Sequence, residues 1–295
     1  MPPDVNLDVL PLRLSDGYET SAYVCRGNIS SIVANVLSSR ISGGSALPVL
    51  QIHGIQSHPG WFMGSATVMA RSGRPVFQVT RRGSGANSLA RGDCPSLNQL
   101  LDDVETACRF VLEQTSASRL NLVGISWGGK LLAAYMALRR PTQIASLTLV
   151  APGIRSRVDV SILTKLRIAS RVLIHPEKLF DIPLNDVELF TANEAMREYL
   201  RADRHRLHQA TARFLGVSKR IDLELRRCRA SSISVPTTLL LASEDRIIHN
   251  ARTLEEVQRL TGGKAAIREL PGQHSLEFES DPNAFYELLV DSLKA

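Results

Sequence analysis

Short apolar runs alternate with amphipathic segments along the chain from residue 46 onward. Each run is bounded by turn residues, which is typical of a strand buried on both faces of a parallel sheet. Strands that alternate with helices form βαβ units, so we predict an α/β protein with a mostly parallel central sheet. The predicted strands are 48–52, 75–79, 120–125, 144–150, 237–241 and 265–270.

Two helices with clear start signals are predicted to cover this sheet. Ser96 and Gln99 have the spacing of a capping box, and apolar residues then recur at helical spacing as far as Leu112. Near the C-terminus, Asp281 is a predicted N-cap, Pro282 suits the first helical position, and an apolar stripe follows. We expect helices on both faces of the sheet.

Two segments depart from the βα alternation. Residues 10–25 form two alternating runs around Asp-Gly, a strong hairpin signal, and are predicted to pair antiparallel at the sheet edge. Between residues 154 and 230 the alternation stops, and helix-prone, charged sequence intervenes. We expect this segment to be a helical cap inserted into a core domain made of residues 1–153 and 231–295.

The positive charge of the chain is concentrated in that insertion. Residues 154–230 hold 16 Lys and Arg against 10 Asp and Glu, an excess that equals the net charge of +6 for all 295 residues. A positive surface suits an anionic membrane, an anionic substrate or plain solubility. The segment has no aromatic interleaving and no nucleic-acid motif, so we expect no nucleic-acid partner.

The four cysteines lie far apart and form no CxxC pair, so neither a zinc site nor a disulfide framework is predicted. The N-terminus lacks the pattern of a signal peptide, and no apolar run approaches the roughly 20 residues of a spanning helix. We therefore expect a cytoplasmic protein.

The strongest chemical signal is Gly124-Ile125-Ser126-Trp127-Gly128, a G-x-S-x-G motif between a predicted strand and a predicted helix. A serine on so sharp a turn needs small residues two positions before and after it, because the backbone there approaches its neighbours closely. The turn projects the hydroxyl beyond the sheet, at a helix N-terminus whose N–H groups stabilise an oxyanion. Ser126 is therefore the predicted nucleophile.

A serine nucleophile needs a base, and the base needs an acid to orient it. Of the seven histidines, His274 follows the last predicted strand, and Asp245 follows the strand before it. Parallel sheets gather catalytic groups at the carboxyl ends of their strands. His274 is the predicted base and Asp245 the predicted acid; Glu244 is the alternative acid, and a solvated loop histidine is the alternative reading of His274.

The loop after the strand at 48–52 is the predicted source of a second oxyanion donor. Gly54 lets the backbone approach a substrate oxygen closely, so we expect the N–H of Ile55 to act beside that of Trp127. His53 is interpreted as a structural hydrogen-bonding residue. The residues predicted to line the substrate pocket are Gly54, His58 and Trp61, and for the last two packing beneath the loop is the alternative.

Taken together, these features resemble the α/β-hydrolases, in particular the group of monoacylglycerol lipases, lysophospholipases and serine-aminopeptidase-like enzymes. The serine, aspartate and histidine follow one another in the order of that fold. Arg82-Gly83-Ser84-Gly85 stands where the group has an Asp-x-Arg-Gly-x-Gly loop, although Thr80 replaces the aspartate and Asn87 replaces a common serine. Segment 184–215 resembles the helical lids of the lipase-like members.

The resemblance implies a serine hydrolase that cleaves carboxylic esters through an acyl-enzyme, with no metal and no cofactor. It implies a small lipid-like substrate such as a monoglyceride or lysophospholipid, and the basic cap suits peripheral membrane contact. Two alternatives stay open: a serine peptidase or amidase of the same fold, and a non-catalytic ligand-binding protein. Binding a peptide amine needs acidic groups, whereas this cap is net basic, which favours ester hydrolysis.

Overall fold

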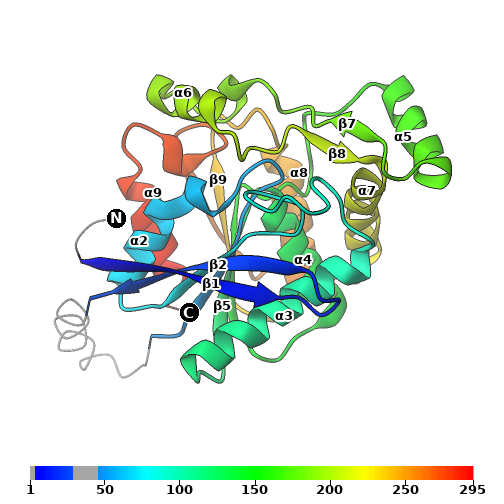
Figure 1. Ribbon diagram of the computed structural model, residues 1–295. Helices are drawn as coiled ribbons and strands as arrows, with labels where there is room; N and C mark the ends of the chain where they lie inside the picture. Colours follow the sequence, from blue (N-terminus) through cyan, green and yellow to red (C-terminus); the bar gives the residue numbers. More distant parts are fainter. Residues whose placement is uncertain (1–3, 29–45, 295) are drawn as a thin grey trace.

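The structure, a computed structural model, describes residues 4–28 and 46–294 (Figure 1); residues 1–3, 29–45 and 295 of the predicted core lie outside this description. The central sheet has eight strands in the order β1-β2-β4-β3-β5-β6-β9-β10. The six strands from β4 to β10 in this order pair in parallel. They are β3 (Val49–Ile52), β4 (Val76–Val79), β5 (Leu120–Ile125), β6 (Ile144–Val150), β9 (Thr237–Ala242) and β10 (Ala266–Leu270).

The six predicted parallel strands are confirmed, each to within one residue at either end. Two of the differences have a common cause. Proline has no N–H to donate, so Pro48 and Pro75 precede β3 and β4 and contribute only their carbonyls. The Pro48 carbonyl accepts from the N–H of Asn121 at 2.9 Å, and the Pro75 carbonyl accepts from that of Val49 at 2.9 Å.

The N-terminal hairpin is also confirmed. Strands β1 (Val5–Arg13) and β2 (Glu19–Gly27) pair antiparallel, and β2 pairs antiparallel with β4, which places the hairpin at the sheet edge. Gly17 in the turn has φ +85°, a backbone conformation that favours glycine.

Helices cover both faces of the sheet, as predicted. In Figure 1, α2 (Met63–Arg71) and α9 (Asn283–Asp291) lie on one side, and α3 (Leu97–Thr115), α4 (Trp127–Arg139) and α8 (Asn250–Thr261) lie on the other. Two details differ from prediction. The Ser96 hydroxyl caps α3, but the Gln99 side chain binds Asp103 instead of completing the capping box. Helix α9 begins after Pro282, although Asp281 still accepts the N–H of Asn283 at 3.1 Å.

The segment between β6 and β9 lies over the carboxyl ends of the strands, across the top of Figure 1. It is not wholly helical, because β7 and β8 form a two-stranded antiparallel sheet within it. Its elements are α5 (Ile162–Ile174), β7 (Leu179–Asp181), η2 (Val187–Leu189), α6 (Glu194–Ala202), β8 (Gln209–Thr211) and α7 (Ala212–Arg227).

This segment is attached to the rest of the molecule by specific polar contacts. The carboxylate of Asp93 accepts from the hydroxyl of Thr211 at 2.6 Å and pairs with Arg213. The N–H of Leu207 donates to the Gln56 carbonyl at 2.9 Å.

Across the described residues, no helix combines the length and apolar character needed to cross a membrane.

Candidate active site

Ser126 occupies the sharp turn between β5 and α4. Its backbone has φ 53° and ψ −121°, a strained conformation for a residue with a side chain. A Cβ on Gly124 would lie 2.6 Å from the Cα of Gly129, and one on Gly128 would lie 2.3 Å from the Ile52 carbonyl oxygen. The two glycines of the motif are therefore required by the closeness of the surrounding backbone.

Three side chains form one hydrogen-bonded chain at the carboxyl ends of β5, β9 and β10. His274 Nε2 lies 2.9 Å from the Oγ of Ser126, and His274 Nδ1 lies 2.7 Å from Oδ2 of Asp245. Both the imidazole and the carboxylate are buried. A buried carboxylate on Nδ1 favours the tautomer in which Nδ1 carries the hydrogen and Nε2 accepts the serine proton.

The loop after β9 selects Asp245 rather than Glu244 as the partner of His274. The second carboxylate oxygen of Asp245 accepts backbone N–H groups of Ile247 at 2.7 Å and Ile248 at 3.0 Å, which fixes the side chain. Glu244 is exposed, and its own N–H donates to the Gly272 carbonyl at 2.9 Å. Glu244 therefore contributes only backbone to this part of the structure.

The chain also matches a family of known proteins. Residues 46–281 match the family model described as serine aminopeptidase, S33. The chain belongs to this family. The match establishes a hydrolase family with the α/β-hydrolase fold, which confirms the fold class predicted from the sequence.

Individual relatives of this S33-family chain are distant. YnbC of Escherichia coli (strain K12), an uncharacterized protein, is 24% identical over 241 residues, 78% of this chain but only 39% of YnbC, so the chain spans about two fifths of that relative. A monoglyceride lipase from Saccharomyces cerevisiae superimposes with a TM-score of 0.79 at 16% identity, covering 98% of this chain and 94% of that one. A monoacylglycerol lipase from Paleococcus ferrophilus superimposes with a TM-score of 0.71 at 20% identity, covering 84% of this chain and 96% of that one. At such identities the likeness shows the fold alone.

The residues of the predicted oxyanion donors, Ile55 and Trp127, line the same cavity as Ser126. Trp127 is the first residue of α4, and a Cβ on Gly54 would lie 3.3 Å from the Cβ of Ser126. Within the described residues, neither the N–H of Ile55 nor that of Trp127 donates to a protein acceptor. Both groups are therefore available to a bound oxygen.

His53 and Arg81 hold the peptide that carries the Ile55 N–H. The Gly54 carbonyl accepts from His53 Nδ1 at 2.9 Å and from Arg81 Nη2 at 2.7 Å. The C=O and N–H of a trans peptide point in opposite directions, so fixing this carbonyl fixes the direction of the Ile55 N–H. Burial, and then the charge of Arg81, hold the pKa of His53 well below its usual range, so the imidazole is neutral.

Arg81 is a part of the site that the sequence interpretation missed. Its Nη2 also donates to the Ile55 carbonyl at 3.0 Å, and its guanidinium lies 4.6 Å from the centre of the Trp127 ring. Arg81 is buried, its pKa is lowered to about 9 by burial, and no carboxylate lies within ion-pair distance of it in the described residues. The only available sequence signal was a second arginine before Arg82 in the loop after β4.

His58 and Trp61 do not border the cavity at Ser126. Instead, His58 Nε2 donates to Asp203 Oδ2 at 3.0 Å and Trp61 Nε1 donates to the same oxygen at 2.6 Å, which connects this loop to the end of α6. The His58 Nδ1 accepts from Gly60 N–H, which assigns the hydrogen to Nε2. His58 and Trp61 therefore pack beneath the loop, which is the alternative prediction for both. Gly54, the third predicted pocket residue, lies directly beside Ser126.

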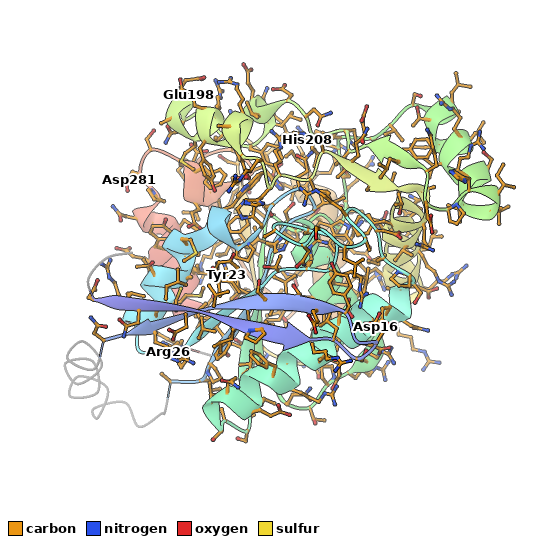
Figure 2. The ribbon with its side chains drawn as sticks, viewed as in Figure 1. Asp16, Tyr23, Arg26, Glu198, His208 and Asp281 are labelled. Atoms are coloured by element: carbon orange, nitrogen blue, oxygen red, sulfur yellow. The ribbon has the colours of Figure 1, made fainter. Side chains whose placement is uncertain are left out.

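The other histidines stand apart from the Ser126–His274 pair. His175 and His208 are exposed, and Figure 2 shows His208 in the segment above the strand ends. His205 lies with its ring 5.7 Å from that of His58. His249 is half-buried and borders the cavity described next.

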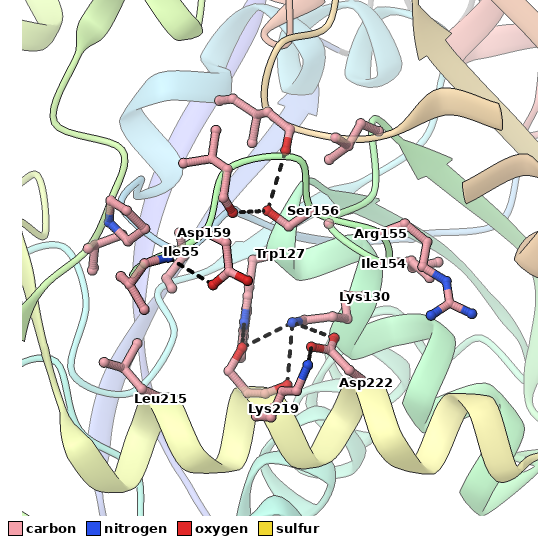
Figure 3. A pocket seen from close by; sticks show the side chains of 18 of the residues that line it. Ile55, Trp127, Lys130, Ile154, Arg155, Ser156, Asp159, Leu215, Lys219 and Asp222 are labelled. Atoms are coloured by element: carbon pink, nitrogen blue, oxygen red, sulfur yellow. Dashed lines mark hydrogen bonds and ion pairs between the residues drawn. The ribbon is translucent and has the colours of Figure 1, made fainter. Parts of the chain in front are cut away.

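A cavity of about 820 Å³ lies between Ser126 and the segment that contains α5 and α7. Its lining mixes apolar and charged side chains: Figure 3 shows Ile55 and Leu215 on one side, and Ile154 beside Lys130, Arg155 and Asp222 on the other. The apolar lining residues include Ile55, Ile154, Ile168, Val172, Leu184 and Leu215.

Ser218 joins α7 to the helix that follows the serine turn. Its hydroxyl oxygen accepts from Trp127 Nε1 at 2.9 Å and from Lys130 Nζ at 3.0 Å. Lys130 is buried and also pairs with Asp222 at 3.0 Å. Contacts between the insertion and α4 thus form one wall of the cavity.

Glu277 attaches the His274 loop to the start of α2. The loop continues into η3 (Leu276–Phe278), and the Glu277 carboxylate accepts the N–H of Ser65 at 2.8 Å as well as the Ser65 hydroxyl. Burial raises the pKa of Glu277 to about 7 despite these hydrogen bonds.

In the described residues, no group of three or more His, Cys, Asp or Glu side chains is arranged to hold a metal ion.

Proposed function

We propose that this chain is a serine hydrolase that cleaves carboxylic esters of lipid-like acyl substrates through an acyl-enzyme on Ser126. The observation that carries the proposal is the hydrogen-bonded chain from Ser126 through His274 to the buried Asp245. A hydroxyl next to an imidazole that a carboxylate orients is the arrangement that activates serine toward a carbonyl carbon.

The reaction would proceed in two steps. His274 Nε2 accepts the Ser126 proton as Oγ attacks the ester carbonyl, and then donates it to the leaving alcohol, which leaves an acyl-enzyme. Water attacks the acyl carbon in the second step and gives its proton to Nε2, which returns it to Oγ of Ser126 as the acyl–Oγ bond breaks and the carboxylic acid leaves. The oxyanion formed in each step binds the N–H groups of Ile55 and Trp127, while the Asp245 side chain stabilises the imidazolium.

The cavity supports an acyl substrate with apolar character. Its volume of about 820 Å³ is within the usual range for a small-molecule site, and Ile55 and Leu215 give one side of it an apolar surface. We assign residues 154–230 the role of a cap, because they supply α5 and α7 to the wall of this cavity. Of the five acidic side chains of the lining, Asp159, Asp222 and Glu256 are already in ion pairs, which leaves fewer carboxylates free to bind a peptide amine there.

Hydrolysis of p-nitrophenyl esters across acyl lengths, beside a monoglyceride, a lysophospholipid and an aminoacyl anilide, tests the proposal. We expect ester cleavage that increases with acyl length and is lost in Ser126→Ala. Cleavage of the anilide alone would favour the peptidase alternative. A folded wild-type protein that cleaves none of these substrates would favour the non-catalytic alternative.

A further inference from the structure

Helix α5 exposes an apolar face that is interrupted only by Ser170. Five of the twelve large hydrophobic side chains exposed in the described part of the chain lie on it, with exposed fractions from 64% to 85%. At about 100° per residue, they fall within an arc of about 120° of the helix surface. No side chain of α5 is buried. The five are Ile162, Leu163, Leu166, Leu173 and Ile174.

The same helix carries positive charge and no acidic side chain. Arg167 and Arg171 follow one border of the apolar face, and neither has an ion-pair partner among the described residues. Lys165 pairs with Asp159, just before the helix. Glu177, after the helix, lies 3.9 Å from Arg213. The exposed side of α5 is therefore apolar with a basic border.

The opposite side of α5 is already occupied. Ile168, Ala169 and Val172 border the cavity that contains Ser126, and α5 packs on α7 so closely that a Cβ on Gly216 would lie 3.1 Å from Val172. Figure 1 shows α5 at the periphery of the molecule, next to α7. Because the inner face is fixed in this way, the apolar face cannot be buried by rotation of the helix.

We propose that α5 docks the protein onto the surface of an anionic phospholipid bilayer. A helix with one apolar face and a basic border lies in the plane of a bilayer interface, with its apolar side chains at the acyl boundary and its cations near the phosphates. This places the membrane contact expected of the basic cap on α5, outside the segment 184–215. It also brings one wall of the Ser126 cavity next to lipid.

Flotation of the full chain with phosphatidylcholine vesicles, with and without phosphatidylserine, tests the docking. We expect binding to phosphatidylserine vesicles that weakens at high salt, because the arginine contribution is screened. The double variant Leu163→Glu/Leu173→Glu should weaken binding at least about tenfold, because two apolar side chains leave the interface. The exposed pair Val9 and Leu89, changed to Glu in the same way, is the matched control and should bind like the wild type.

The charge and the apolar face are tested separately. Arg167→Glu/Arg171→Glu should abolish the preference for phosphatidylserine. Ser126→Ala should bind vesicles like the wild type, so failure of the proposed function and failure of docking are distinguishable. The docking proposal is overturned if the wild type shows no preference for phosphatidylserine vesicles, or if the Leu163/Leu173 variant binds them unchanged. It is equally overturned if the wild type is a dimer that does not bind vesicles, and the Leu163/Leu173 variant only converts this dimer to a monomer.

Discussion

Replacing Arg81 by methionine tests whether the loop that carries the Ile55 N–H must be held in place. Arg81 donates to the carbonyls of Gly54 at 2.7 Å and Ile55 at 3.0 Å. Methionine is an unbranched apolar side chain that ends before the position of the guanidinium, so it removes both hydrogen bonds and the charge. The Ile55 N–H itself remains in the variant, so the substitution changes its orientation and leaves its chemistry intact.

The expected loss follows from the number of anchors on this peptide. Removing an oxyanion donor outright lowers kcat by about 10²–10³-fold. In Arg81→Met, His53 still binds the Gly54 carbonyl at 2.9 Å, so one of the anchors survives. We therefore expect kcat to fall by about 10–100-fold, with little change in KM, because the donor acts mainly on the charge that forms in the transition state.

Stability should change much less than activity in this variant. Burying a guanidinium without a carboxylate partner is unfavourable, and its removal offsets part of the cost of leaving two carbonyls without donors. We expect the free energy of unfolding to fall by no more than about 2 kcal/mol. Kinetics on a soluble p-nitrophenyl ester and urea unfolding measure the two effects, and Arg81→Lys should fall between the variant and the wild type. A kcat within about twofold of wild type, or a change in KM alone, would refute this role of Arg81.

Three further substitutions test other parts of the structure. Gly128→Ala should destabilise the fold by about 3 kcal/mol or prevent folding, because its Cβ would lie 2.3 Å from the Ile52 carbonyl oxygen; urea unfolding measures this, and an unchanged midpoint would contradict it. Lys130→Met should cost about 1–3 kcal/mol in the same assay, because it leaves the partly buried carboxylate of Asp222 with only the longer pair to Lys219 at 3.8 Å. A neutral result would show that the Lys130–Asp222 pair contributes nothing. In the folded wild type, Glu277 keeps its proton up to a pKa of about 7, whereas in the unfolded chain it releases the proton near 4.5. The stability of the wild type relative to Glu277→Gln should therefore decline as pH rises between these two values. A difference in Tm that does not vary with pH would contradict the raised pKa.

The sheet and the serine turn could be predicted because each depends on local sequence. Each parallel strand carries a short, mostly apolar run, and Pro48 and Pro75 mark where β3 and β4 begin. The turn at Ser126 needs glycine at two fixed positions, and its neighbours Asp245 and His274 follow directly from strand order. The apolar runs and the glycine spacing are properties of short segments, so they can be recognised without knowing which distant residues come into contact.

Other parts of the site depend on contacts between distant segments. Arg81 becomes informative only when its guanidinium is seen against Gly54 and Trp127, and a second arginine in a loop predicts nothing of this kind. Glu277 follows His274 closely in sequence, but its partner Ser65 is on α2. The predicted pocket residues His58 and Trp61 bind Asp203 because α6 folds over them, and no periodic pattern predicts where an inserted segment comes to lie.

Labelling with a fluorophosphonate probe, followed by peptide mass mapping, tests the central claim most directly. The account predicts a single adduct on Ser126 of the folded wild type, no adduct in Ser126→Ala, and labelling slowed by several orders of magnitude in His274→Ala. An adduct on a different residue, or no labelling of the folded wild type, would contradict it.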